Sequence, residues 1–212
     1  MKKKPGFIIT FYKIANPTSQ NGFATVSQIT KLNKIFRESY LNNIRHGIKV
    51  RIMKYNDNRF LFYAQIPSES GRGIYYDVVI EMEKSPNDKS FLHAPLTIWS
   101  NDPNFQFTYT WVMNNNGLIP EFLIPKCSTI ALTKDPEERN PLKLWHIHKY
   151  TIFLRYHILF KGYLNPVYLE KDYEKGLTES IIFRSVKSQE EKYNELKSKG
   201  GKIEKDINVN GF

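Results

Sequence analysis

The chain has 212 residues, a formal net charge of +10 at pH 7 and a hydrophobic content of 41%. This length and composition suffice to build a packed core and exclude a largely disordered protein. The single cysteine, Cys127, excludes an internal disulfide and favours a reducing compartment. No stretch contains the roughly 20 apolar residues that span a bilayer, so we expect no membrane contact, and the first apolar run is too short for a signal peptide.

The positive charge is concentrated in the first quarter of the chain. Residues 1–55 contain 11 basic residues and one acid, Glu38, and so account for the whole net charge of +10. Such a one-sided field attracts polyanions or acidic protein surfaces, although a lysine-rich surface without a partner is the competing interpretation. The basic residues predicted to contact a partner or a polyanion are Lys2, Lys3, Lys4, Lys31, Lys34, Arg37, Arg45, Lys49 and Arg51.

The chain begins with a predicted strand and a predicted helix. Residues 7–14 are rich in β-branched and aromatic side chains, which is typical of a strand. Residues 25–46 carry apolar side chains at spacings of three and four. This period predicts an amphipathic helix whose outer face is basic.

An antiparallel meander is predicted for residues 48–83, where apolar and polar side chains alternate. Asp77 and Glu81 fall on the outward face of this meander. We expect that face to be solvated, with the two acids paired across the sheet to Lys49 and Arg51.

Two more strands are predicted for residues 96–100 and 105–113. The second contains aromatic residues at every other position: Phe105, Phe107, Tyr109 and Trp111. Alternating aromatics can stack nucleic-acid bases, but no basic residues stand between these four. The pattern therefore favours a row that packs into the core.

A buried helix is predicted for residues 141–161, because Asn140 suits the N-cap, Pro141 the first turn and Gly162 the end of the helix. A strand remains the alternative for this segment. A short charged helix is predicted near residues 188–199. We therefore expect one α+β domain over residues 1–187, with a mostly antiparallel sheet, an amphipathic helix near its N-terminus and a buried helix after the sheet, followed by a charged tail or docking arm over residues 188–212.

No known catalytic motif occurs in the chain, so we expect neither an enzyme nor a cofactor. Three histidines and the cysteine are of zinc-ligand type: His146, His148, His157 and Cys127. On one helix, His146 and His148 would point in nearly opposite directions, so we expect structural histidines and no metal. A metal-dependent nuclease that uses Asp77 or Glu81 is a lesser alternative.

One region of the chain carries a resemblance to known proteins. It contains a strand that leads into Ser100-Asn101-Asp102-Pro103, the alternating aromatics, then Arg139-Asn140-Pro141 and a helix with Lys149. This pattern, over about residues 96–160, resembles poorly characterised virion structural proteins of tailed bacteriophages. The resemblance implies a small component of the head, neck or tail, assembled in the host cytoplasm.

The expected function is that of a structural or interaction component of a larger assembly, in which other virion subunits or acidic protein surfaces are the partners in a homo- or hetero-oligomer. The alternative is a nucleic-acid-binding protein that uses the basic N-terminal surface on DNA.

Overall fold

The computed structural model describes residues 34–41, 47–68, 74–136 and 148–198. Its strands are β1 (Lys49–Asn56), β2 (Arg59–Pro67), β3 (Tyr75–Glu83) and β4 (Leu96–Ser100). Its helices are the π-helix η2 (Phe105–Tyr109), α3 (Thr110–Asn115), the 3-10 helix η3 (Glu121–Lys126), α4 (Thr129–Thr133), α5 (Lys149–Phe160), α6 (Pro166–Asp172) and α7 (Glu179–Ser198). Residues 34–41 are also helical.

The four strands form one antiparallel sheet in the order β1-β2-β3-β4. The meander predicted for residues 48–83 and the strand predicted for residues 96–100 are therefore confirmed. Both outer edges of the sheet hold a further backbone hydrogen bond. The Glu174 N–H donates to the Ile52 carbonyl of β1 at 2.8 Å, and the Ile98 N–H of β4 donates to the Leu118 carbonyl at 2.7 Å.

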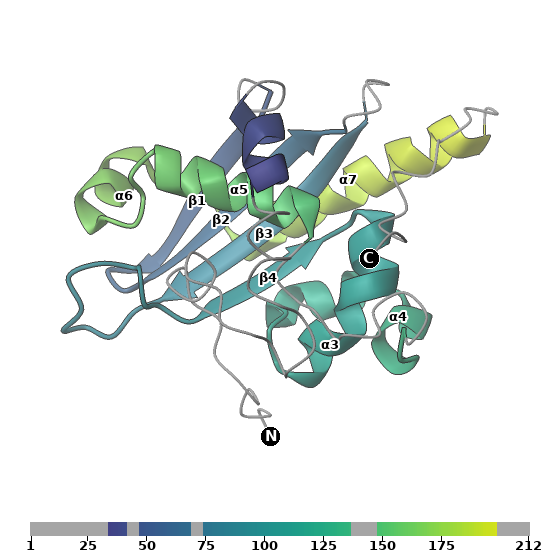
Figure 1. Ribbon diagram of the computed structural model, residues 1–212, viewed down its shortest axis with the longest axis horizontal. Coiled ribbons are helices and arrows are strands. Elements are labelled where there is room, and N and C mark those ends of the chain that lie inside the picture. Colours follow the sequence, from purple (N-terminus) through teal and green to yellow (C-terminus); the bar gives the residue numbers. More distant parts are fainter. Residues whose placement is uncertain (1–33, 42–46, 69–73, 137–147, 199–212) are drawn as a thin grey trace.

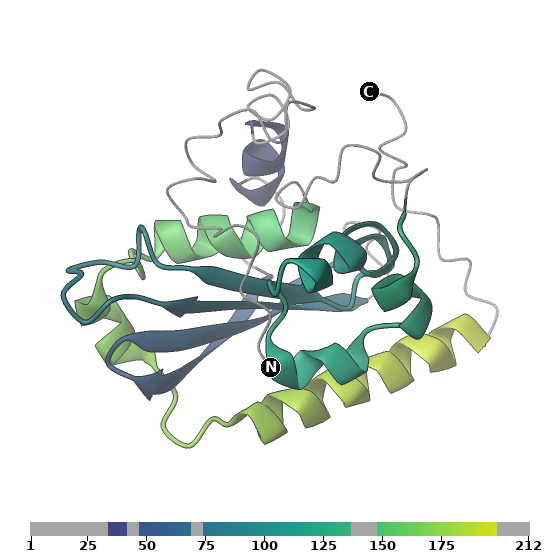
Figure 2. The same ribbon diagram turned by 90° about the horizontal axis from the view of Figure 1, so that it is seen from below.

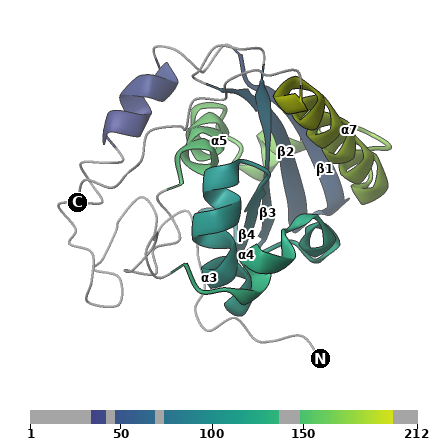
Figure 3. The same ribbon diagram turned by 90° about the vertical axis from the view of Figure 1, so that its right-hand side faces the viewer.

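Helices cover both faces of the sheet (Figure 1). Helix α5 lies on one face and α7 on the other, as the view along the sheet plane shows (Figure 2). Helices α3 and α4 lie beside β4 (Figure 3). This arrangement of a mostly antiparallel sheet with packed helices is the predicted α+β domain.

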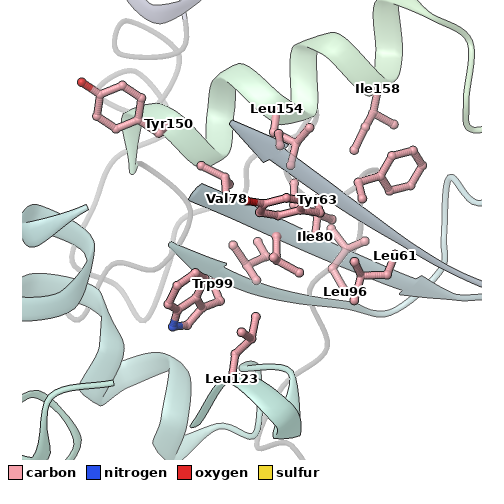
Figure 4. Close-up of a cluster of buried hydrophobic side chains, with 14 of the residues drawn as sticks. Leu61, Tyr63, Val78, Ile80, Leu96, Trp99, Leu123, Tyr150, Leu154 and Ile158 are labelled. Carbon is pink, nitrogen blue, oxygen red and sulfur yellow. The ribbon is translucent and has the colours of Figure 1, made fainter. Parts of the chain in front are cut away.

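The α5-covered face is the main apolar core. Leu154 and Ile158 point from α5 toward the sheet, where Val78 and Ile80 stand on β3 (Figure 4). All four side chains are at most 1% exposed. Gly162 follows α5 with φ of 72°, a conformation that favours glycine, so the predicted end of this helix is confirmed.

The strand predicted for residues 105–113 is wrong, because these residues are helical in η2 and α3. In this helical segment Phe105 and Tyr109, one turn apart, are buried, whereas Phe107 is 43% exposed. The four aromatic residues therefore do not form a row on one face of a strand. The alternative that such a row stacks nucleic-acid bases is excluded for the same reason.

Two predicted helix boundaries also need correction. Helix α5 begins at Lys149, and its N-cap is His148, whose backbone is extended. The predicted caps Asn140 and Pro141 lie outside the described residues. Helix α7 begins at Glu179, well before the predicted start near residue 188, so the proposed boundary between domain and tail falls within a helix.

The helical residues 34–41 pack against the outer side of α5. The ring of Phe36 meets Phe153 edge-on at 6.5 Å between centroids, and Tyr40 contacts His157 in the same manner at 6.4 Å. The remainder of the helix predicted for residues 25–46, and the strand predicted for residues 7–14, lie outside the described residues. Within the described part of the chain, no helix is long and apolar enough to cross a membrane.

Candidate interaction surface and buried polar network

The structure describes four of the nine basic residues predicted to contact a partner. Lys34 and Arg37 are exposed on the helix of residues 34–41, and Lys49 is exposed on β1. Arg51 is half-buried on the same face of β1 as Lys49. The others, Lys2, Lys3, Lys4, Lys31 and Arg45, lie outside the described residues.

These four residues do not form one surface. Lys34 and Arg37 lie on the α5 side of the sheet, whereas Arg51 points to the α7 side, because it pairs with Tyr63, whose hydroxyl contacts Ser185 of α7. Two faces of one sheet cannot meet a flat partner together. Any shared partner of these residues would have to reach around the sheet.

Arg51 forms a bidentate ion pair with Glu174. Its Nε and Nη2 atoms donate to the two carboxylate oxygens at 2.8 Å and 2.6 Å. This hydrogen bond raises the pKa of Arg51 and lowers the pKa of Glu174. The predicted pairing of Lys49 and Arg51 with Asp77 and Glu81 is therefore wrong, because β2 separates β1 from β3.

Asp77 is fully buried, which overturns the expected solvated face. Its Oδ1 accepts a hydrogen bond from the Tyr63 hydroxyl at 2.6 Å, and its Oδ2 accepts one from Asn101 at 3.0 Å. Because Tyr63 donates its proton to Asp77, the Ser185 hydroxyl donates to the Tyr63 oxygen at 2.8 Å. Gln65 donates to the same oxygen at 3.1 Å. We call these five residues the Asp77 network.

The Asp77 network joins the sheet to α7 without a cation. Burial raises the pKa of Asp77 to about 7, and the negative charge of Glu190 on α7 adds to this effect. The hydrogen bonds from Tyr63 and Gln65 oppose it. No described lysine or arginine bonds to Asp77, and Lys126 pairs with Glu190 of α7 at 2.9 Å. The carboxyl therefore gains or loses its proton near neutral pH.

Glu81, the other acid of the nuclease alternative, is also buried. It forms an ion pair with Arg59 and accepts a hydrogen bond from Thr97 at 3.3 Å. Among the residues that the structure describes, no group of three histidine, cysteine or acidic side chains is placed to hold a metal ion.

A second buried pair links the segment just after β4 to the N-cap of α5. His148 Nε2 lies 2.6 Å from Asp102 Oδ2, and both side chains are at most 4% exposed. His148 Nδ1 also accepts the Thr151 N–H at 3.4 Å, which caps α5. The structural role predicted for His148 is confirmed. The rings of Phe105 and Tyr109 pack edge-on against the His148 ring, at 5.2 Å and 5.6 Å between centroids.

The other candidate ligands are dispersed. His157 Nδ1 lies 3.3 Å from the Tyr40 hydroxyl, and burial lowers the pKa of His157 to about 4, helped by the charge of Lys161. Cys127 is buried, and burial raises its thiol pKa to about 11, so its reactive thiolate is scarce at neutral pH. His146 lies outside the described residues.

Exposed large apolar side chains are concentrated on three elements of the molecule. In the part of the chain that the structure describes, eight such residues are exposed, and six of them lie on residues 34–41, α5 and α6. Four of these flank the turn between α5 and α6, and we call them the α5–α6 patch: Leu159, Phe160, Val167 and Tyr168, which are 38%, 59%, 58% and 49% exposed. The described part of α7 contributes none.

The α5–α6 patch is held on a rigid support. The Asn165 side chain caps α6 by accepting the Val167 N–H at 3.0 Å, and Pro166 occupies its first turn. The Tyr168 ring lies against the turn, since a Cβ atom added to Gly162 would be 3.3 Å from it. Leu169 is fully buried beneath the patch.

Neither the Asp77 network nor the α5–α6 patch was predicted from the sequence. A spacing of four between Ile182 and Val186 could have indicated that α7 packs on the sheet and buries Asp77. Comparisons with protein-family models, curated proteins and solved structures found no match to this chain.

Proposed function

We propose that the protein is a structural or interaction component of a larger assembly, and that this assembly is a tailed-phage virion. The observation that carries the proposal is the concentration of exposed apolar side chains on residues 34–41, α5 and α6. Single exposed apolar residues are ordinary, but contiguous patches mark surfaces that a partner covers. The resemblance of residues 96–160 to virion structural proteins supports the choice of assembly.

The partner surface in this proposal is helical. Residues 34–41 lie against α5, so their exposed Ile35 and Leu41 belong to the same side of the sheet as Leu159 and Phe160. The exposed Lys34 and Arg37 stand among these apolar residues. Such a mixed surface suits a protein neighbour that is partly acidic.

Co-purification tests the proposal. Particles from infected cells are separated from free protein on a density gradient, and the protein is followed by immunoblotting. We expect it to sediment with intact particles at a constant ratio to the major capsid protein. Recovery only in the free fractions would contradict the proposal.

DNA binding is the second candidate, and the exposure of Lys34 and Arg37 on one helix supports it. If phosphates are the partner, affinity for duplex DNA falls log-linearly with salt, with a slope that reports the number of contacts. Replacing both residues by Gln would reduce that slope by about two. No binding in low salt would exclude this candidate.

A further inference from the structure

The acidic and the basic side chains near the α5–α6 patch differ in whether they form bonds within the protein. The three acids of α6 and of the segment just after it are engaged by the protein itself. Glu170 bonds Lys54 at 2.7 Å, and Glu174 bonds Arg51. Asp172 accepts the Tyr163 hydroxyl at 2.7 Å.

The bases beside the patch are not engaged in this way. Lys161, Lys171 and Lys175 are exposed, and no described acid forms an ion pair with any of them. Asp57 also pairs with Lys54 at 2.7 Å, so five bases (Arg51, Lys54, Lys161, Lys171 and Lys175) stand against four acids (Asp57, Glu170, Asp172 and Glu174), and the local charge is positive by one. The patch is thus an apolar surface with a positive rim.

We infer that the α5–α6 patch binds an acidic protein segment that carries apolar anchors, an inference that rests on the proposed function and names the partner of that surface. Apolar side chains of the segment would cover Val167 and Tyr168, and its carboxylates would meet Lys161 and Lys171. Buried apolar contacts at the centre and charge pairs at the rim are the usual division of roles in an interface.

Rigidity favours this use of the patch. The backbone of Val167 and Tyr168 is held in α6 by the Asn165 cap and the buried Leu169, so a partner does not have to order the helix itself.

A random-peptide display library provides the test. The full chain is used for selection, with counter-selection on a variant that combines Val167→Ser, Tyr168→Ser, Lys161→Glu and Lys171→Glu. We expect the enriched peptides to combine acidic and apolar residues. Failure to enrich any sequence, or enrichment of basic or purely apolar ones, would overturn the inference.

The affinities of the variants for one enriched peptide are then compared by fluorescence anisotropy. We expect Val167→Ser with Tyr168→Ser to weaken binding by about tenfold or more at any salt concentration. Lys161→Glu with Lys171→Glu should weaken it by about tenfold in low salt and by less in high salt. The controls are Ile130→Ser, an exposed apolar site elsewhere, and Lys187→Glu with Lys192→Glu on α7, which should change binding by less than about twofold.

Other occupants give different results in the same experiments. Binding to phosphatidylserine vesicles that the patch variants abolish would identify a membrane surface and overturn the inference. Sedimentation showing a dimer that the patch variants dissociate would identify a second copy of the chain and also overturn it. Circular dichroism confirms that each variant is folded.

Particle incorporation separates this inference from the proposed function. If wild-type protein enters particles and the patch variants enter equally well, the inference fails while the proposed function stands. If wild-type protein never accompanies particles, the proposed function fails whatever the peptides show. Loss of the patch variants alone from particles supports both.

Discussion

Helices α5 and α7 cover opposite faces of one sheet by different chemistry. Eight of the twelve residues of α5 are buried, most of them apolar. Of the described α7 side chains only Ile182 and Val186 are buried, and Ile181 and Phe183 pack against the core while partly exposed. Polar contacts add to these, such as Ser185 with Tyr63 and Glu190 with Lys126. Apolar burial depends little on pH, whereas the attachment of α7 includes a titrating carboxyl. The attachment of α7 therefore rests on polar contacts to a greater extent than that of α5.

The two sides also respond to pH in opposite directions. Asp77 on the α7 side has a raised pKa of about 7, and His157 on the α5 side has a lowered pKa of about 4. Their windows overlap between about pH 4 and pH 6.5, where one contribution falls as the other rises. In the wild-type protein the two contributions to the slope of unfolding free energy against pH should partly cancel. Substituting either residue alone should reveal the contribution of the other.

Replacing Asp77 with Asn should have the largest effect. Because the folded-state pKa is above the ordinary value of 3.8, the stability that Asp77 contributes is present at low pH and lost as pH rises to about 7. The full loss is about 4 kcal/mol at most. Urea unfolding at several pH values should show the variant gaining stability over wild type between about pH 4 and pH 8. An equal gain from Asp88→Asn, at an exposed turn, would refute the attribution.

Replacing His157 with Gln should reverse this picture. Burial holds the folded-state pKa near 4, below the ordinary 6.5, so the stability that neutral His157 contributes is present above pH 6.5 and lost on acidification. The loss is about 3 kcal/mol. Relative to wild type, the variant should therefore lose less stability between about pH 7 and pH 4 in the same urea titration. His93→Gln, exposed in a turn, is the control. If the two variants show the same dependence of unfolding free energy on pH, the effect does not come from His157.

A pair of identical substitutions compares the two helices directly. Ile158 of α5 and Ile182 of α7 are both fully buried. We expect Ile158→Ala to lower the free energy of unfolding by about 3 kcal/mol and Ile182→Ala by about 2 kcal/mol. The loss is smaller at Ile182 because fewer apolar side chains would line the cavity that the substitution leaves. Denaturant unfolding measures both values. A larger loss at Ile182 would break the comparison.

The smallest expected effect is that of Tyr63→Phe, which removes the hydroxyl at the centre of the Asp77 network. We expect a loss of about 1 kcal/mol and faster hydrogen exchange in α7 while α5 stays protected. Tyr163→Phe, which removes a hydroxyl bonded to Asp172, is the matched control and should leave α7 unchanged. Equal acceleration of exchange in both helices would show that α7 does not open separately.

The sheet was predictable because its strands follow an alternation that β pairing requires. The helix at residues 105–113 was not, because Phe105, Phe107 and Tyr109 fit a strand period as well as a partial helix period. A better indication stood just before them: Pro103 opens the helical stretch, as proline often does at a first helical turn. Local periodicity needs such boundary residues to separate two structures.

The Asp77 network was beyond the sequence for a different reason. Alternation correctly placed Asp77 and Glu81 on one face of β3, but it does not say what covers that face. The cover comes from α7, about a hundred residues later, and only the docked helix turns an exposed acid into a buried one. The count of charges along the sequence similarly indicated Arg51 as a partner contact, but Glu174 neutralises it from a distant loop. Long-range contacts decide the state of both groups.

The occupied edges of the sheet limit how this protein can join others. A strand from a neighbour that added to β1 would have to displace the Glu174 backbone, and one that added to β4 would have to displace Leu118. Sharing of strands between subunits is thus disfavoured at both ends. In the proposed assembly, each copy would therefore bring a sheet that its own chain completes, and its release would not require the sheet to unfold.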